Sequence, residues 1–408
     1  MNEKVVISGV GMVTPLGTGR EIFSRRLFGG DSGIAPITSF DTSRFLSRLG
    51  AEVRGFVPRD FISVRNLRRM DRISSMTAAS ARMAIEDAGF GIDAANRDRV
   101  GIILGVSYGS TDVAAQFAGT LFNEGPGTVS PILVPNTVIN APAGHTSIEL
   151  GFRGINSTVN HREASAETAI AYAAAEIKNG RADVLLAGGA DIISEFFFEI
   201  LTRFKAVSPI GGGPEGARPF DRRRNGPVIG EGAGVLCIET LAHARARGVR
   251  PYCEIAGWGL SSSRSSLTDW PPDPQGPVLA MTRALESAKI TPMDIDYVSA
   301  SANGGRKLDQ LEADALSAIF AKEKQKPFIA SIKGAVGESF SSGGIRSAAM
   351  AISIREETLP PTVGLEKPIK PLPFILNAKK EARIDYGLVN GFSSGGTFAS
   401  LVLKRTDA

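Results

Sequence analysis

The chain contains few of the residues that bind metals or form disulfides. Its 408 residues include two cysteines and three histidines, and no histidine follows His243. Two cysteines exclude a disulfide framework, and the scattered spacing of His145, His161 and His243 excludes the common structural zinc patterns. We therefore expect no metal site and no cofactor.

Both cysteines lie in short apolar runs that predict buried strands. Cys237 belongs to GVLCIE and Cys253 to PYCEIAG. In such a run a cysteine is usually a small hydrophobic residue. The sequence thus offers no evident cysteine nucleophile, and its second half offers no histidine base.

Long apolar segments are also absent. No stretch reaches the ~18 uncharged residues of a spanning helix, and MNEK is followed directly by VVISGVGMV, without the pattern of a signal peptide. We expect a cytoplasmic protein with no membrane span. The net charge of +4 is mild, so it fits an acidic partner as well as none, and we expect no nucleic-acid partner.

What the chain does contain is glycine and alternating patterns. Forty-six glycines separate short β-rich runs from alanine-rich segments with helical spacing, which predicts a layered α/β fold. The periodicity predicts helices over 74–89, 164–180 and 343–359. Nine β-rich runs are expected as strands, namely 5–13, 100–109, 183–191, 232–240, 253–260, 296–304, 327–337, 386–396 and 400–405.

A faint internal repeat divides the chain. VVISGVGMV resembles CEIAGWGL, DVLLAGGAD resembles YGLVNGFSSGG, and the helix after Glu163 resembles the helix after Glu338. A repeat this long indicates a duplicated fold unit. We expect two similar halves, 1–245 and 250–408, joined within LAHARARGVRPY.

Several ordered blocks carry a family resemblance: VVISGVGMVTPLG, RRMDRISSMTAASARMAIEDAG, DVLLAGGAD, ARPFDRRRNGPVIGEGAGVLCIE and NGFSSGGTFASLVLKR. Together they resemble the β-ketoacyl-acyl carrier protein synthase family over essentially the whole chain. The resemblance implies the α/β thiolase fold, with two similar halves in a five-layered α-β-α-β-α arrangement.

The catalytic positions of that family are altered here. Active members use a cysteine at the start of a buried helix, where the helix N-terminus lowers the thiol pKa, together with two histidines. The resemblance places Glu163 at the cysteine position, Ser301 at the first histidine and Glu338 at the second. A carboxylate cannot form the thioester, so we expect no condensing activity from this chain alone.

Residues around the altered positions match the family in part. Lys333 matches the family's lysine and Glu312 the acidic residue expected to pair with it, while Asp309 anchors the alignment. Ser393 and Ser394 stand where the family usually has glycine and a gating phenylalanine. The resemblance therefore implies a retained support around a lost catalytic triad.

The functional analogue is the chain-length factor, the ketosynthase-like β subunit of type II polyketide synthases. By resemblance, this chain pairs with an active ketosynthase, with a homodimer as the fallback, and shapes a tunnel for acyl or polyketide chains on an acyl carrier protein. Typical members carry glutamine at the cysteine position, so Glu163 departs from their pattern. By the same resemblance, polyene and fatty acid biosynthesis are further pathways in which such a subunit is expected.

Other interpretations remain open. Glu163 and Glu338 in one poorly solvated cleft would push one pKa upward, as in a general acid–base pair of an enzyme with altered chemistry. Alternatively, Lys333, Arg162 or a partner neutralises both carboxylates, since a buried charge more often needs a partner than has a task. A homodimeric relative with an unassigned binding role and a divergent condensing enzyme are two further readings.

Two surface features are also candidates. Arg65, Arg68 and Arg69 resemble the basic patch where family members meet the acidic carrier protein, although a solvated helix face is as good an interpretation. A phenylalanine-rich segment has at least one ring expected to face a tunnel or an interface, although core packing is the commoner role; it contains Phe196, Phe197, Phe198 and Phe204.

Overall fold

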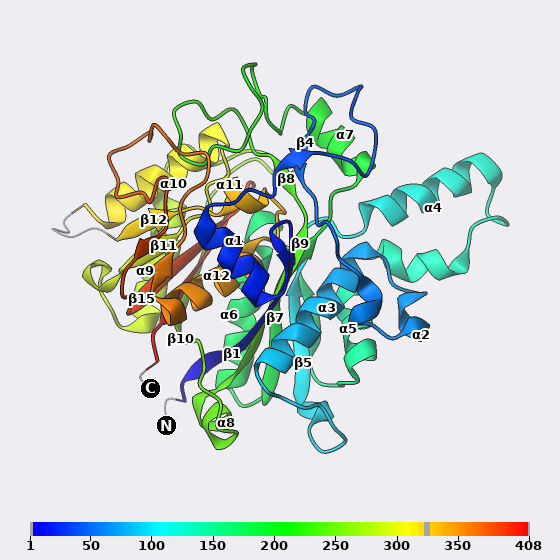
Figure 1. Ribbon diagram of the computed structural model, residues 1–408, viewed down its shortest axis with the longest axis horizontal. Coiled ribbons are helices and arrows are strands. Elements are labelled where there is room, and N and C mark those ends of the chain that lie inside the picture. Colours follow the sequence, from blue (N-terminus) through cyan, green and yellow to red (C-terminus); the bar gives the residue numbers. More distant parts are fainter. Residues whose placement is uncertain (1–2, 322–326, 407–408) are drawn as a thin grey trace.

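The computed structural model describes residues 3–321 and 327–406. One mixed sheet runs through the molecule in the order β12-β11-β15-β16-β10-β1-β9-β7-β5-β6, with β2 paired to β1 (Figure 1). Its strands are β1 (Val5–Thr14), β2 (Gly17–Thr18), β5 (Val100–Gly105), β6 (Asn156–Val159), β7 (Val184–Asp191), β9 (Gly232–Thr240), β10 (Cys253–Ser262), β11 (Tyr297–Ser299), β12 (Phe328–Ala330), β15 (Tyr386–Phe392) and β16 (Thr397–Lys404).

The sheet repeats one strand order on each side of its centre. Outward from β1 the order is β1-β9-β7-β5-β6, and outward from β10 it is β10-β16-β15-β11-β12. The two groups meet where β1 and β10 pair antiparallel, at Val6 with Glu254 and Ile7 with Cys253. We propose residues 1–245 and 250–408 as the two halves, because the similar runs in the sequence become β1 and β10 in one case and β7 and β15 in the other.

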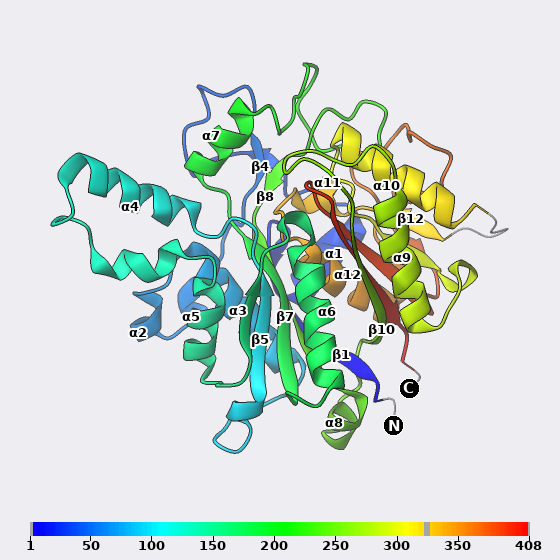
Figure 2. The ribbon, with the colours of Figure 1, turned by 180° about the vertical axis from the view of Figure 1, so that it is seen from behind.

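Helices lie on both outer faces and between the two strand groups (Figures 1 and 2). Helices α6 (Ser165–Lys178) and α12 (Gly343–Glu356) contact each other and strands of both groups. Helix α3 (Arg72–Asp87) covers β1 and β9, while α9 (Gln275–Ala288) covers β10 and β16 and contacts α10 (Arg306–Ile319). The expected five-layered α-β-α-β-α arrangement is confirmed.

Glycines in the two central strands explain the close packing of the outer helices. A Cβ atom on Gly11 of β1 would lie 2.0 Å from the Ser80 carbonyl oxygen of α3. A Cβ on Gly259 of β10 would lie 2.1 Å from the Ala280 oxygen of α9. Only a residue without a side chain permits this approach of helix and strand backbones. The GVG and GWG of the repeated runs thus perform the same packing role in both halves.

The three helices predicted from periodicity are confirmed as α3, α6 and α12. The β-rich run 327–337 is a strand only over β12, because its second part turns into α11 (Lys333–Val336). The chain leaves the sheet at Ser331, whose N–H donates to the Thr362 hydroxyl and whose own hydroxyl donates to the Ala302 carbonyl. The prediction of a strand beyond residue 330 was therefore wrong.

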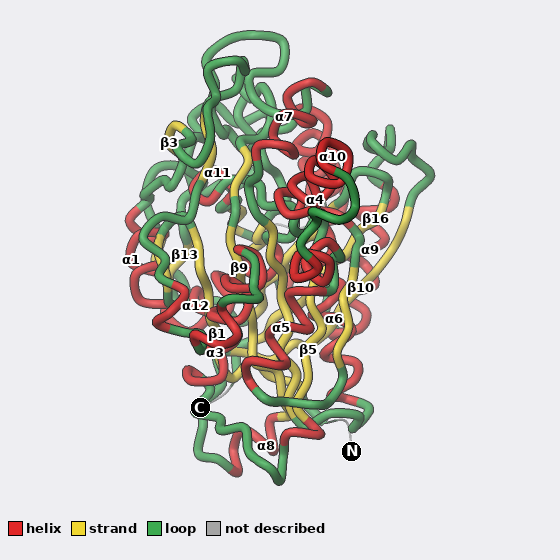
Figure 3. Tube along the Cα trace, turned by 90° about the vertical axis from the view of Figure 1, so that its right-hand side faces the viewer, coloured by secondary structure: helices red, strands yellow, loops and turns green. Residues whose placement is uncertain are grey.

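Shorter elements complete the fold, and Figure 3 shows loops gathered at the end of the molecule that carries α7, α10 and α11. None of the helices within the two described ranges is long and apolar enough to cross a membrane. These elements are α1 (Arg20–Gly29), α2 (Val64–Leu67), α4 (Thr111–Glu124), α5 (Ala141–Leu150), α7 (Glu195–Arg203), α8 (Leu241–Ala246), η1 (Pro58–Asp60), η2 (Arg97–Arg99), η3 (Pro131–Thr137), η4 (Arg162–Ala164), η5 (Pro292–Asp294), β3 (Ala35–Pro36), β4 (Leu49–Ala51), β8 (Ile229–Gly230), β13 (Thr358–Leu359) and β14 (Lys380–Glu381).

Candidate functional site

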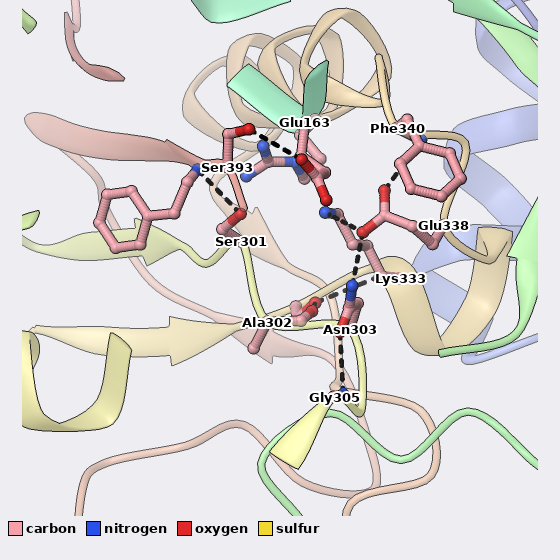
Figure 4. Close-up of polar contacts among 12 residues, drawn as sticks. Glu163, Ser301, Ala302, Asn303, Gly305, Lys333, Glu338, Phe340 and Ser393 are labelled. Carbon is pink, nitrogen blue, oxygen red and sulfur yellow. Dashed lines mark hydrogen bonds and ion pairs between the residues drawn. The ribbon is translucent and has the colours of Figure 1, made fainter. Parts of the chain in front are cut away.

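Glu163 lies in the short η4 turn directly before helix α6, and its side chain is buried. Two hydroxyls from the turn after β15 hold its carboxyl group. Ser393 Oγ donates to Oε2 at 2.8 Å (Figure 4). Ser394 Oγ donates to Oε1 at 3.1 Å. The carboxyl group of Glu163 is therefore fixed by side chains from the opposite half of the chain.

Burial raises the pKa of Glu163, and the negative charge of Glu338 raises it further. The N–H of Glu163, the Arg162 guanidinium and the Ser393 hydroxyl act in the opposite direction. Figure 4 shows the carboxyl groups of Glu163 and Glu338 pointing toward the same space. The neutral form of Glu163 is thus more favoured here than in water.

Glu338 forms an ion pair with Lys333 that is enclosed by protein. The Lys333 Nζ lies 2.6 Å from Glu338 Oε2, and their side chains are 0% and 1% exposed. The Asn303 amide donates to the same oxygen at 2.8 Å, and the Phe340 N–H donates to Oε1 at 3.0 Å. Because both oxygens of Glu338 have donors, its charge is compensated within the site.

The expected pairing of Lys333 with Glu312 was wrong. The Oε1 atom of Glu312 accepts the Ser301 N–H at 3.0 Å and the Asn390 amide at 3.1 Å, and its Oε2 accepts the Ala302 N–H at 2.7 Å. These donors occupy both of its oxygens, whereas the single turn of α11 brings Lys333 beside Glu338. Glu312 instead supports the loop that carries Ser301.

Asp309 also holds the loop that carries Ser301. Its carboxylate accepts the N–H groups of Asn303 at 3.0 Å, Gly304 at 3.2 Å and Phe220 at 2.7 Å. Burial raises the pKa of Asp309 to about 7, although these N–H groups and Arg224 oppose the shift. Ser301 Oγ accepts the N–H of Phe392, the residue before Ser393. The positions of Ser301 and Glu163 are thus linked through two neighbouring residues.

A second enclosed ion pair was not found by sequence reasoning. Glu167 of α6 and Arg346 of α12 form a hydrogen-bonded pair in the middle layer, and both side chains are fully buried. The Arg346 guanidinium also donates to the carbonyl oxygens of Ala300 and Asn390. The available signal was a single charged residue among the small and apolar residues of the first turns of each helix, well before the charged residues at the helix ends.

Asp191, at the end of β7, was missed as well. Its carboxylate accepts the N–H groups of Tyr108 and Ser341, each at 3.0 Å. Burial raises the pKa of Asp191 to about 6, against the effect of these donors. Asp191 therefore joins the loop after β5 to the segment between α11 and α12, which also carries Glu338 and Phe340.

Comparison with known proteins identifies the family of this site. The description "Beta-ketoacyl synthase, N-terminal domain" matches residues 2–244, and "Beta-ketoacyl synthase, C-terminal domain" matches residues 252–366. The chain belongs to the β-ketoacyl synthase family. Across 407 residues it is 34% identical to the 3-oxoacyl-[acyl-carrier-protein] synthase 2 of Coxiella burnetii, covering 98% of each chain.

Solved structures show the same fold. "The ishigamide ketosynthase/chain length factor" has a TM-score of 0.93 and 29% identity, covering 100% of both chains. A type II polyketide synthase ketosynthase in complex with its acyl-carrier protein has a TM-score of 0.88, also covering 100% of both chains. At 23% identity, the second likeness shows the β-ketoacyl synthase fold alone.

The phenylalanines predicted near a tunnel separate into two pairs. Phe197 and Phe198 are buried, whereas Phe196 and Phe204 are exposed. The Phe197 ring lies 5.6 Å from the Phe340 ring, so it reaches the surroundings of Glu338. The role of these rings in a β-ketoacyl synthase tunnel stays a prediction.

The three arginines of the predicted carrier-protein patch are exposed on and just after α2. Side chains from other parts of the fold hold the turn that carries these arginines. Asn136 donates to the Arg69 carbonyl oxygen at 2.9 Å, and Glu149 accepts the N–H of Ser63 at 3.0 Å and the Asn66 amide at 2.8 Å. Arg65, Arg68 and Arg69 therefore project from a fixed turn, and their binding role stays a prediction.

Proposed function

We propose that this chain is a ketosynthase-like subunit without condensing activity of its own, which pairs with an active ketosynthase. Its role is that of a chain-length factor, shaping an acyl or polyketide tunnel in type II polyketide, polyene or fatty acid biosynthesis. The observation that carries the proposal is the Glu163 carboxyl group, held by Ser393 and Ser394 at the start of α6. An acyl thioester forms on a cysteine thiolate at this position in active members of the family, and a carboxylate cannot replace that thiolate.

The surroundings of Glu338 support the same proposal. A histidine at this position would donate a hydrogen bond to a thioester carbonyl. Glu338 in its ion pair with Lys333 accepts hydrogen bonds and has no N–H or O–H to donate. The histidine donor that stabilises the developing oxyanion in active members of the family is therefore missing at this position.

An exposed apolar arm and a sheet edge that has no neighbouring strand among the described residues support the assembly with a partner. Helix α4 and the η3 segment project from the body, and β6 is an outer strand of the sheet (Figure 2). Unpaired strand edges and contiguous apolar surfaces are typical of protein interfaces. The large apolar side chains exposed on and beside this arm are Phe122, Ile132, Val134, Val138 and Ile139.

Changing the arm tests the pairing. The double variant Ile132→Asp/Val134→Asp places two carboxylates on this apolar surface, where burial would leave them without partners. We expect the amount of heterodimer to fall roughly tenfold or more. Native mass spectrometry after co-expression with a ketosynthase that keeps its cysteine and two histidines measures this effect.

Met293 provides the matched control, since its side chain is 76% exposed in the η5 turn, away from the arm. Met293→Asp is expected to leave pairing unchanged. Heterodimers at the wild-type level in the arm variant would contradict the proposed interface, and homodimers that persist beside the intact partner would favour the homodimeric alternative.

The acidic acyl carrier protein is the second proposed partner, docking at Arg65, Arg68 and Arg69. Three exposed guanidinium groups on a fixed turn provide the charge complementarity that steers such an encounter. A cytoplasmic location is part of the same proposal.

A second candidate is an enzyme with altered chemistry that uses Glu163 and Glu338. It is favoured by the raised pKa of Glu163 beside the Lys333–Glu338 ion pair, because unequal environments separate acid and base roles. The same ion pair and the hydrogen bonds from the two serines are equally consistent with a cluster that only stabilises the fold. This structural role is the interpretation we prefer.

Glu163→Gln separates these two candidates. A glutamine amide retains an oxygen that accepts the serine hydroxyls, so we expect product formation by the reconstituted pair to change by about twofold or less. A catalytic carboxylate would lose roughly 100-fold when neutralised. A loss of that size with an unchanged unfolding temperature would establish catalysis at Glu163.

A further inference from the structure

Arg162, the residue directly before Glu163, connects two segments that lie far apart in the sequence. Its guanidinium donates to the Tyr108 hydroxyl at 2.9 Å and to the Leu267 carbonyl oxygen. Tyr108 follows β5, and Leu267 belongs to the loop 263–269 after β10, where its side chain is 76% exposed. One side chain thus joins the two halves of the chain beside the buried carboxyl group of Glu163.

The backbone at this point is constrained. Arg162 has a φ of 51° and Phe340 a φ of 56°, in the left-handed region that side chains with a Cβ rarely adopt. The first residue adjoins Glu163 and the second lies two residues after Glu338. Residues in this region persist where the surrounding structure fixes them, and they are concentrated at functional sites.

Both constrained residues direct their side chains to Tyr108. Arg162 binds its hydroxyl group, and the Phe340 ring lies 4.9 Å from the Tyr108 ring. The Phe197 ring also packs against Tyr108, with the ring centres 4.1 Å apart and the planes tilted by 40°. We call Tyr108, Phe197 and Phe340 the aromatic cluster; it adjoins Glu338 through the Phe340 N–H, which donates to Glu338, and it adjoins Glu163 through Arg162.

The loop 263–269 provides the second contact of the Arg162 guanidinium. It rests on the turn that holds Glu163, because the Gly395 N–H donates to the Asp269 carbonyl at 2.9 Å and the Ser263 N–H to the Gly396 carbonyl at 2.8 Å. The Arg162 guanidinium spans the distance between this loop and the aromatic cluster. Its two acceptors are the Leu267 carbonyl oxygen and the Tyr108 hydroxyl. Within the described residues no carboxylate forms an ion pair with Arg162.

We propose that Arg162 is a specificity-determining residue that closes the approach to Glu163, so that an acyl thioester on a carrier arm cannot enter this chain's own site. The inference deepens the proposed function, on which it rests. The Arg162 side chain connects the two halves of the chain and blocks access to Glu163. Acyl substrates therefore bind at the active site of the partner subunit.

A cysteine introduced at residue 163 reports whether the site is closed. Cys237 and Cys253 are fully buried, and burial raises the pKa of the Cys237 thiol to about 12, so the native background is low. The probe is iodoacetamide, and alkylation is followed by intact-protein mass spectrometry. We expect Glu163→Cys to react slowly, and Glu163→Cys/Arg162→Ala to react roughly tenfold faster or more, because two hydrogen bonds of a charged group are lost.

The direction of the change distinguishes closure from electrostatics. A guanidinium beside residue 163 favours the reactive thiolate, so its removal would slow alkylation if charge were the controlling factor. Alanine keeps the Cβ and therefore the same backbone constraint at Arg162. Arg162→Lys retains the charge but can make one of the two contacts, and an intermediate rate is expected. Arg181→Ala is the matched control, since Arg181 forms an exposed ion pair with Glu176 at the other end of α6.

An equal or slower rate in the Arg162→Ala variant would overturn the proposal. If Glu163→Cys lowers the unfolding temperature, Ser393→Cys serves as the reporter at the same carboxyl contact, with the same comparison. Failure of this inference and failure of the proposed function are distinguishable. Rapid alkylation would show an open site, whereas condensation by the wild-type chain alone would contradict its non-condensing role.

Discussion

Lys333→Ala is expected to lower the free energy of unfolding by about 3–5 kcal/mol, because removal of one partner leaves the other charge buried and uncompensated. The Lys333 ammonium and the Glu338 carboxylate are 2.6 Å apart and almost completely enclosed. The Asn303 amide and the Phe340 N–H would remain as the donors to Glu338. Urea unfolding, followed by intrinsic fluorescence, measures the change.

Removing both charges provides the control. Lys333→Met/Glu338→Gln leaves no buried charge at this position, so it is expected to lose much less stability than Lys333→Ala. Lys307→Ala removes a lysine whose partner, Asp269, is at the surface, and it should change stability little. If Lys333→Ala were as stable as the Lys307 variant, the ion pair would have no structural role.

The helices and the layered fold could be predicted because their signals are local. Alanine-rich periodicity indicated α3, α6 and α12, and the repeated GVG and GWG marked two strands that lie against helices. The extent of 327–337 was less predictable. Its apolar residues fit both a strand and a buried helical turn, and the choice depends on where Ser331 finds its partners.

The sequence indicated which residues lie together at the candidate site, but not which carboxylate forms an ion pair with which basic residue. The resemblance marked Glu163, Ser301 and Glu338, and the fold brings these three residues to one region. Which carboxylate meets Lys333 depends on the geometry of α11, which no spacing in the sequence specifies. The Glu167–Arg346 pair has the same character, since its members are brought together only by the packing of α6 on α12.

The purified chain alone is expected to take up no acyl group from an acyl carrier protein. Glu163 cannot form a thioester, and Cys237 and Cys253 are fully buried in β9 and β10, where burial raises the pKa of both thiols. Intact-protein mass spectrometry is expected to show the unmodified mass, while a ketosynthase with its cysteine gains an acyl adduct under the same conditions. A stoichiometric adduct on this chain would exclude the proposed role.

The most direct measurement is product formation from acyl and malonyl carrier proteins by the reconstituted pair, with the partner's nucleophilic cysteine intact or replaced by alanine. The pair with the intact cysteine is expected to form product, and the pair with the alanine variant to fall to background, because this chain supplies no nucleophile. Product that persists without the partner's cysteine would show that this chain itself condenses.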